Sequence, residues 1–214
     1  MRLAIFGATG RTGRDVVEQA LQDGHEVTAL TRDPARIPPH QRLRVVAGDV
    51  RDPAPVAETI DGAHAVLSTL GRQRRGPEIC TEGIQTVLSA MAPGGPRRLI
   101  VLSNYGVAES RHRSLYVSVS WLLERRVLLD KEHMEALVRN SDAEWSRYGA
   151  RRATIRSGEP FGGSDCYWSG PEGAETYGSR TGNRHVLDQW TCQRGSRAVH
   201  WPPGAQAGWP VGAL

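Results

Sequence analysis

A glycine-rich segment near the start of the chain constrains the fold more than any other feature. The segment at residues 7–13, GATGRTG, directly follows the apolar run at residues 2–6 and precedes a helical pattern at residues 14–22. This order predicts a buried strand, a tight turn and a helix that packs on the strand. Glycines allow the backbone to bend sharply in such a turn and let helix and strand approach closely.

Short apolar runs and helical patterns continue to alternate through the first two thirds of the chain. They predict strands at residues 26–30, 43–47, 65–68 and 98–102, and helices at about residues 56–60, 84–91 and 116–140. Strands that alternate with helices are typical of a parallel sheet covered on both faces, with right-handed crossovers. We therefore expect an α/β protein with a Rossmann-like, doubly wound parallel sheet in three layers, α/β/α.

The composition of the chain changes near residue 146. Residues 1–145 contain 36 Val, Ile and Leu residues, whereas residues 146–214 contain only 6 of them, together with 12 of the 24 glycines and 4 of the 6 tryptophans. The later stretch has neither helical nor strand periodicity. We expect a single domain at residues 1–145, followed by an aperiodic tail at residues 146–214 that is poorly ordered or non-native.

The glycine-rich turn is also the strongest chemical signal. Between a strand and a helix, such a turn binds the pyrophosphate of a dinucleotide through backbone N–H groups and the positive end of the helix dipole. The candidate binding residues are Gly7, Thr9, Gly10, Arg11, Thr12 and Gly13. A tight turn that holds no ligand is the alternative interpretation.

The end of the second predicted strand bears on the choice of nucleotide. Nicotinamide enzymes that use NAD usually have an acid there, which binds the ribose 2′-hydroxyl. Here the strand runs into Thr31, Arg32 and Asp33, and the Arg32 guanidinium is suited to a 2′-phosphate. We therefore favour NADP (NADPH) over NAD. A surface arginine paired with Asp33 or Asp52 is the alternative.

Two further junctions are expected in the same cleft. Asp49 and Val50 follow the third predicted strand and are expected beside the adenine, whereas Leu70 and Gly71 follow the fourth and are expected near the nicotinamide ribose. Ligands of open parallel sheets bind at the carboxyl ends of the strands, near the point where strand order reverses. The basic run at residues 72–75 either attracts acidic substrates or forms a solvated loop.

Composition argues against several other classes of protein. No apolar run approaches the ~20 residues of a membrane helix, and the first residues do not resemble a signal peptide. The tail residues Cys166, His185, Cys192 and His200 lack the close spacing of zinc ligands. The formal charge of +4 permits nucleic-acid binding without requiring it. We expect a cytoplasmic protein with a small-molecule substrate and no metal, nucleic-acid or membrane partner; the oligomeric state stays open.

Residues 1–145 resemble the atypical short-chain dehydrogenase/reductase group, whose members have an NAD(P)-binding Rossmann domain. Within this group the pattern is most similar to flavin/biliverdin-IX-beta-reductase-like proteins and nitrogen-metabolite-repressor-like NAD(P)H-binding proteins. The segments that carry the resemblance are residues 7–13, 31–33, 48–50, 102–104, 130–132 and 138–145. The resemblance implies NADPH binding and reduction of a small planar or carbonyl substrate.

The resemblance also implies two catalytic candidates. Ser103 matches a Ser or Thr that follows the fifth strand in such proteins, where a hydroxyl can bond a substrate oxygen, although a structural hydroxyl is the alternative. Lys131, the single lysine of the chain, matches a lysine often seen in this branch and is expected at a ribose or the substrate; a solvated helix lysine is the alternative.

The Tyr–Lys pair of typical short-chain enzymes is absent, because Tyr105 and Tyr116 are followed four residues later by Glu109 and Ser120. The proton donor is then solvent, or the protein binds its cofactor without turnover. The leading hypothesis is an NAD(P)H-dependent oxidoreductase that reduces a carbonyl, quinone or flavin-like substrate. The rival hypothesis is a non-catalytic NAD(P)-binding redox sensor.

The chain departs from the resemblance after Trp145. Relatives have there a sixth strand of the Thr-Ile-Val-Arg-Pro kind, which the sequence after Trp145 does not show. Our hypothesis is that residues from about 146 onward are translated in a shifted reading frame, which DNA sequencing around codon 146 tests. Loss of the sixth strand predicts that the fifth is an exposed sheet edge and that NADPH binding is more robust than catalysis.

Overall fold

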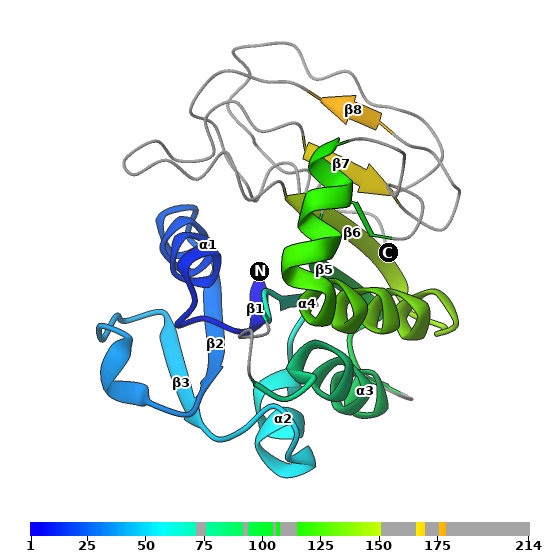
Figure 1. Ribbon diagram of the computed structural model, residues 1–214. Helices are drawn as coiled ribbons and strands as arrows, with labels where there is room; N and C mark the ends of the chain where they lie inside the picture. Colours follow the sequence, from blue (N-terminus) through cyan, green and yellow to red (C-terminus); the bar gives the residue numbers. More distant parts are fainter. Residues whose placement is uncertain are drawn as a thin grey trace.

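The computed structural model describes residues 1–71, 76–91, 94–104, 106–107, 115–150, 166–169 and 176–178. The strands are β1 (Arg2–Phe6), β2 (Glu26–Thr31), β3 (Leu43–Ala47), β4 (Ala65–Ser68), β5 (Arg98–Asn104), β6 (Glu144–Ala150), β7 (Cys166–Ser169) and β8 (Thr176–Gly178). The helices are α1 (Arg11–Gln22), α2 (Pro53–Ile60), α3 (Ile79–Met91) and α4 (Leu115–Arg139), with a short 3₁₀ turn η1 at Pro34–Arg36. Figure 1 shows their arrangement.

The described strands form one sheet in the order β3-β2-β1-β4-β5-β6-β7-β8. The first six strands are parallel, and β7 and β8 are added antiparallel beyond β6. Strand order reverses between β1 and β4, which lie side by side at the centre of the parallel part. The Rossmann-like α/β fold expected from the sequence is confirmed, and the antiparallel extension was not predicted.

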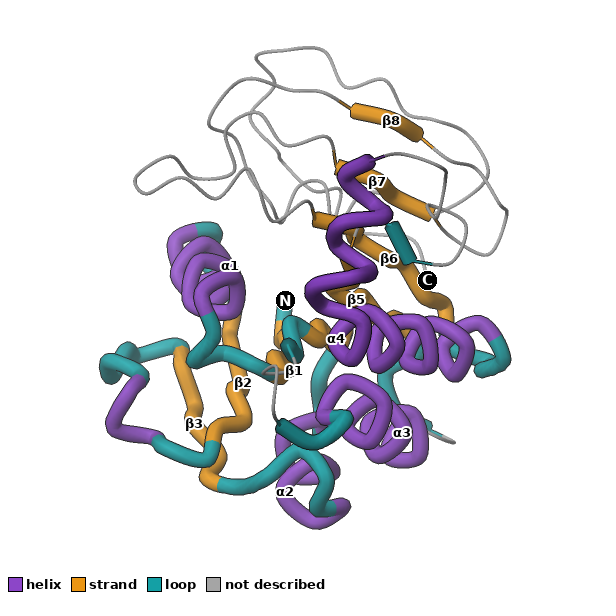
Figure 2. Tube along the Cα trace, viewed as in Figure 1, coloured by secondary structure: helices purple, strands orange, loops and turns teal. Residues whose placement is uncertain are grey.

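Helices cover both faces of the parallel sheet. One face packs against α1 through Val16, Val17 and Ala20. The opposite face packs against α2, α3 and the second half of α4, where the buried residues include Val56, Ile84 and Met134. Figure 2 shows these helices in purple and the strands of the sheet in orange. The strands carry apolar residues on both faces of the sheet. Helices must therefore cover both faces, which gives three layers.

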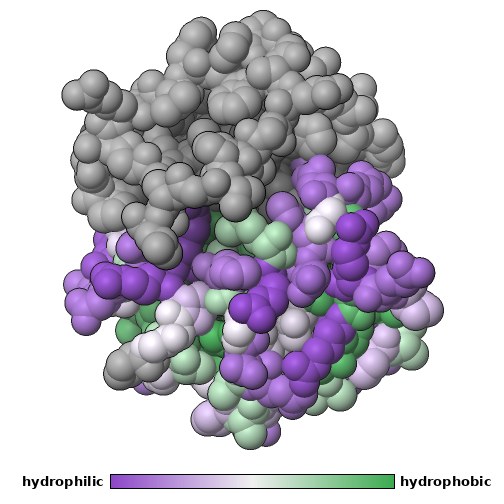
Figure 3. All heavy atoms as spheres, turned by 180° about the vertical axis from the view of Figure 1, so that it is seen from behind, coloured by the Kyte–Doolittle hydropathy of each residue, from purple (hydrophilic) through white to green (hydrophobic). Residues whose placement is uncertain are grey.

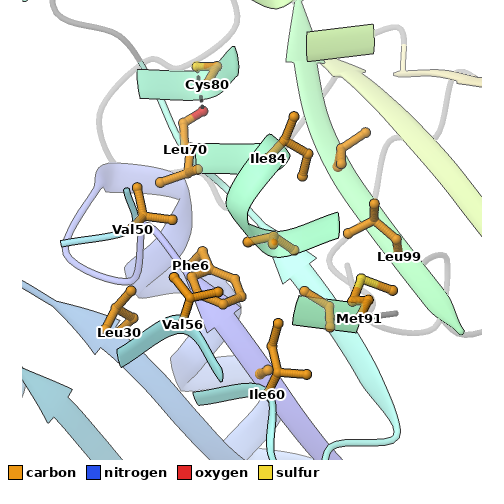
Figure 4. Packing of buried hydrophobic residues seen from close by; sticks show 14 of the residues in the cluster. Phe6, Leu30, Val50, Val56, Ile60, Leu70, Cys80, Ile84, Met91 and Leu99 are labelled. Carbon is orange, nitrogen blue, oxygen red and sulfur yellow. Dashed lines mark hydrogen bonds between the residues drawn. The ribbon is translucent and has the colours of Figure 1, made fainter. Parts of the chain in front are cut away.

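Phe6 is the largest fully buried side chain among the described residues. It belongs to the core between the sheet and helices α2, α3 and α4. Figure 4 shows it between Leu30, Val56 and Leu70, with residues of α3 packed beyond. The core therefore joins the end of β1, directly before the glycine-rich turn, to the helices on one side of the sheet. On the face shown in Figure 3, hydrophilic and apolar residues are interspersed over the described part of the surface.

The expected loss of the sixth strand is wrong. All seven residues of β6 pair with β5, from Arg98 opposite Glu144 to Asn104 opposite Ala150, so β5 is not a sheet edge. The strand lacks Val, Ile and Leu, which is why periodicity did not predict it. Its pairing is helped by Trp145, which packs against the core, and by Arg147, which is buried. The hypothesis of a shifted reading frame stays a prediction.

Helix boundaries differ from the expected ones for local reasons. The first helix begins at Arg11 rather than residue 14, because Gly10 is its N-cap residue. The second begins at Pro53, where the Asp52 carboxylate accepts from the Ala54 N–H and proline suits the first helical position. The long helix α4 is interrupted at Glu124, whose φ of −126° and ψ of 23° are not helical. Figure 1 shows the change of direction.

Candidate functional site

The glycine-rich turn lies at the point where strand order reverses. Gly7 directly follows β1 and has a φ of +84°, a conformation that favours glycine, and its carbonyl accepts from the Gly10 N–H at 3.0 Å. Thr69, directly after β4, donates both its N–H and its hydroxyl to the Phe6 carbonyl, each at 2.9 Å. The ends of β1 and β4 are therefore joined at the carboxyl edge of the sheet, where such folds bind ligands.

Two of the three glycines leave no room for a side chain. A Cβ atom at Gly7 would lie 2.8 Å from the backbone of Thr69. At Gly13, a Cβ atom would lie 2.1 Å from the Gly7 carbonyl oxygen. Gly10 differs, since a Cβ there would meet only the Gly7 oxygen, at 3.2 Å. Helix α1 therefore packs tightly on the turn, which places its first N–H groups beside the strand end.

The N-terminus of α1 is left open to an anion. Its N-cap residue Gly10 makes no side-chain cap bond, and the first turn has no acidic residue. By contrast, Asp52 caps α2, and the buried Asp130 accepts from the backbone N–H groups of Cys80 and Thr81 at the start of α3. The backbone around Gly10 therefore fits a pyrophosphate, and Thr9, Arg11 and Thr12 lie half-buried or exposed around it.

Arg32 is exposed at the carboxyl end of β2. The preceding Thr31 hydroxyl accepts from the Asp33 N–H at 3.1 Å, which fixes the backbone on either side of Arg32. In the part of the chain that the structure describes, Arg32 forms no ion pair with Asp33 or Asp52, the partners of the alternative interpretation. Its guanidinium is therefore available to an anionic group.

Asp49 follows β3 and is held by a neighbouring arginine. The Arg51 guanidinium donates to both carboxylate oxygens of Asp49, at 2.9 Å each. These bonds lower the pKa of Asp49 to about 2, and the positive charge of Arg32 contributes further. Asp49 is therefore charged at neutral pH, and its charge is largely met by Arg51, which reduces its repulsion of a nearby phosphate.

The other predicted residues of the cleft contribute in a different way than the sequence suggested. The side chains of Val50 and Leu70 are buried in the core, where Gly83 of α3 packs on both. Figure 4 shows them among the residues around Phe6. Gly71 is exposed and has open space beside it. Only the backbone of Val50 and Leu70 is therefore available to a ligand. The basic run at residues 72–75 lies outside the described residues.

Lys131 is not a solvated helix lysine. It is 2% exposed, and its Nζ donates to the carbonyl oxygens of Leu70, at 2.7 Å, and Leu102, at 2.5 Å. These carbonyls belong to the segment after β4 and to β5. The ammonium group therefore ties together two neighbouring segments at the carboxyl edge of the sheet, which is a positioning role.

Replacement of Lys131 by methionine keeps the aliphatic stem and removes the donors. We expect a loss of about 1–3 kcal/mol of unfolding free energy, because two buried carbonyls lose a charged donor. Urea denaturation measures this loss, with Arg125→Met, an exposed basic residue of the same helix, as the control. Equal stability of both variants would show that the two carbonyl bonds contribute nothing.

Ser103, the other catalytic candidate, is bonded to a residue that the sequence did not suggest. Its hydroxyl donates to Oε1 of Glu135, and the other carboxylate oxygen of Glu135 accepts from Arg139 at 2.9 Å and from Arg147 of β6. Ser103, Glu135 and Arg147 are each at most 2% exposed. Burial raises the pKa of Glu135, whereas the two arginines and the Ser103 hydroxyl act to lower it.

Asp130, Glu135 and Arg147 are the main residues that sequence reasoning missed. The spacing of Lys131 and Glu135 on one helix face was visible, since the two lie one turn apart. Apart from Arg139, one turn after Glu135 on α4, their partners come from distant segments or from a strand that was not expected. No group of three or more potential metal ligands occurs among the described residues. Of the tail candidates, Cys166 begins β7, and His185, Cys192 and His200 lie outside the described residues.

Comparison with known proteins agrees with this geometry. The family model for NAD(P)H-binding proteins matches residues 7–147, from the first glycine of the turn to the buried arginine of β6. By fold, the protein is a Rossmann-like α/β protein. By sequence, it belongs to this NAD(P)H-binding family.

Similar curated proteins match about half of the chain. It is 33% identical over 104 residues to the protein Rv2047c of Mycobacterium tuberculosis, covering 49% of this chain and 12% of that protein. It is 27% identical over 106 residues to YwnB of Bacillus subtilis, covering 50% and 48%. It is 29% identical over 116 residues to cinnamoyl-CoA reductase 1 of Oryza sativa, covering 49% and 34%. The chain thus spans less than half the length of these relatives.

Solved structures share the fold. ChuY, an anaerobilin reductase from Escherichia coli, superposes with a TM-score of 0.58 at 19% identity, covering 76% of this chain and 83% of its own. A short-chain dehydrogenase/reductase from Veillonella parvula, in complex with NADP, superposes with a TM-score of 0.59 at 18% identity, covering 68% and 67%. Among the described helices, none is both long and apolar enough to cross a membrane.

Proposed function

We propose that the protein is an NAD(P)H-dependent reductase of a small carbonyl, quinone or flavin-like compound, with NADPH preferred, acting in the cytoplasm. The observation that carries the proposal is the turn at residues 7–13, closed against Thr69 at the strand-order reversal and leading into an uncapped helix. Reductases among the relatives and structural neighbours support the reaction class.

The chain's residues have distinct parts in this proposal. Backbone N–H groups from Gly7 to Gly13 bind the pyrophosphate, and Arg32 binds the 2′-phosphate. The segments that end in Asp49 and Gly71 border the adenine and the nicotinamide ribose. When bound, the reduced nicotinamide supplies a hydride. Lys131 holds the segment after β4 and strand β5 together through the Leu70 and Leu102 carbonyls, and Ser103 lies near the end of β5.

A panel of acceptors tests the reaction. NADPH oxidation is followed at fixed enzyme concentration with flavins, quinones and dicarbonyls, alongside fluorescence titration with NADPH and NADH. The proposal predicts saturable NADPH binding and acceptor-dependent oxidation. Saturable NADPH binding without NADPH oxidation by any acceptor of the panel would contradict the reductase proposal.

A non-catalytic NAD(P)-binding sensor is the second candidate. It is favoured by the fact that the Ser103 hydroxyl and the Lys131 ammonium are both already bonded within the protein. The absence of a Tyr–Lys pair points the same way. The same panel separates the two functions, since a sensor binds the nucleotide and leaves it unoxidised.

Replacement of Arg32 by alanine tests the nucleotide preference. We expect the dissociation constant for NADPH to rise about 10- to 100-fold, since a charge-assisted phosphate contact is worth about 1.5–3 kcal/mol. NADH affinity is expected to change little. Arg36→Ala, an exposed arginine of the following turn, is the control. Equal losses for the two nucleotides would contradict a 2′-phosphate contact.

A further inference from the structure

The direction of one hydrogen bond limits what Ser103 can do. Glu135 accepts from Ser103, Arg139 and Arg147, which is the pattern of a charged carboxylate. A hydroxyl can donate one hydrogen bond, and here Glu135 accepts it. In this state Ser103 offers only lone pairs to a neighbouring group, so it cannot stabilise negative charge that develops on a substrate oxygen.

Protonation of Glu135 reverses this bond. An uncharged carboxyl group has a proton of its own, which it can donate to the Ser103 oxygen while Arg139 and Arg147 keep the other oxygen as acceptor. The Ser103 proton is then free to point away from Glu135. Two protonation states of one buried carboxyl group thus give two directions of one hydroxyl.

We infer that Glu135 is a positioning residue that sets the hydrogen-bonding direction of Ser103 at the carboxyl end of β5. When charged, Glu135 accepts the hydrogen bond of the Ser103 hydroxyl; when uncharged, it leaves this hydroxyl free to donate to another acceptor. The inference deepens the proposed function, on which its effect on rate rests. It concerns a residue pair on α4 and β5 that are 32 positions apart.

The surroundings of Glu135 are suited to such a switch. Burial favours its uncharged form, whereas Arg139 on α4 and Arg147 on β6 favour its charged form. Lys131, one turn earlier on α4, adds positive charge nearby, although its Nζ is bonded to the Leu70 and Leu102 carbonyls. The net effect is a raised pKa, so the uncharged form of Glu135 persists to a higher pH than that of an exposed glutamate.

Glutamine in place of Glu135 mimics the uncharged state. Because Oε2 of Glu135 accepts from both Arg139 and Arg147, the amide oxygen of the glutamine side chain would take that place. Its NH₂ group would then face Ser103 and donate to the hydroxyl oxygen. The variant E135Q therefore turns the Ser103 proton outward at every pH.

Infrared spectroscopy tests the inference without catalysis. On acidification of the NADPH-bound and free protein, we expect a carboxylic-acid band that is absent in E135Q and shifted in Ser103→Ala, where the acid proton loses its acceptor. If E135Q does not fold, the difference between wild type and Ser103→Ala identifies the band. Absence of the band throughout the folded pH range, or a band that Ser103→Ala leaves unmoved, overturns the inference.

Quinone reduction by NADPH provides the second arm. At a pH where Glu135 is charged, we expect E135Q to be about tenfold faster than wild type, because a donor to a developing oxyanion has a large effect on rate. The gain should vanish in the double variant E135Q/S103A and be absent in Glu132→Gln on the same helix. If Glu135→Gln slows quinone reduction equally in proteins with Ser103 and with alanine at that position, the inference is overturned. If wild type reduces no acceptor, the reductase proposal fails, and the infrared result still decides the role of Glu135.

Discussion

Alanine at Gly13 is expected to abolish measurable NADPH binding. The new Cβ would lie 2.1 Å from the Gly7 carbonyl oxygen, a distance at which α1 or the turn must move. The moved atoms are the backbone groups that would hold the pyrophosphate, so binding is lost even if the fold survives. Overpacking of this kind also costs about 1–3 kcal/mol of stability.

Gly10→Ala is the matched control for this prediction. Its Cβ would lie 3.2 Å from the same oxygen, and its φ of −71° suits any residue. Fluorescence titration with NADPH, with circular dichroism to verify folding, compares the two variants. We expect Gly10→Ala to fold with stability close to that of wild type and to lose less affinity than Gly13→Ala, because its methyl group adds bulk beside the pyrophosphate site without displacing the turn. NADPH binding by Gly13→Ala at the wild-type level would contradict the role given to the turn.

Methionine at Arg147 is expected to be the most destabilising change in the second half of the sheet. It removes one partner of a buried ion pair and leaves Glu135 with a charge that only Arg139 still meets directly. Breaking such a pair costs about 3–5 kcal/mol. Arg97→Ala is the control, because Arg97 and its partner Glu144 are 76% and 69% exposed and their pair is worth less than about 1 kcal/mol.

The Arg147→Met effect also depends on pH. Burial places the folded-state pKa of Glu135 above its ordinary value, so this group favours folding at low pH, and that contribution is lost as pH rises through the raised pKa. Removal of Arg147 raises the pKa further, so the destabilisation should be smallest in acid. Urea denaturation at several pH values measures it. A pH-independent loss, or one no larger than that of Arg97→Ala, would contradict the buried pair.

The parallel sheet up to β5 could be predicted from the sequence because its signals are local. Apolar runs marked β1 and β4 at their observed bounds, and glycines marked the turn at Gly7. The sixth strand could not be predicted in this way, since it has no aliphatic run. Pairing with β5 and the buried Arg147 stabilise it instead, and both depend on residues distant in sequence.

The candidate site was predictable to the extent that backbone forms it. A glycine pattern reports close packing directly, so the turn at Gly7 and Gly13 could be found. The directions of the side chains could not be predicted from the sequence, because they depend on contacts between helices and strands. Lys131 was noticed as a single lysine, yet its bonds to Leu70 and Leu102 required the strand order. Glu135 lies one turn after Lys131, but this spacing alone does not distinguish it in a chain with many charged helix residues.

Titration calorimetry of the wild-type protein with NADPH and NADH tests the central claim most directly. If the backbone of the glycine-rich turn binds a dinucleotide pyrophosphate, saturable heat is expected with one nucleotide per chain, and with the higher affinity for NADPH. Folded protein that gives no heat of binding with either nucleotide, even at the highest concentrations that dissolve, would contradict the account.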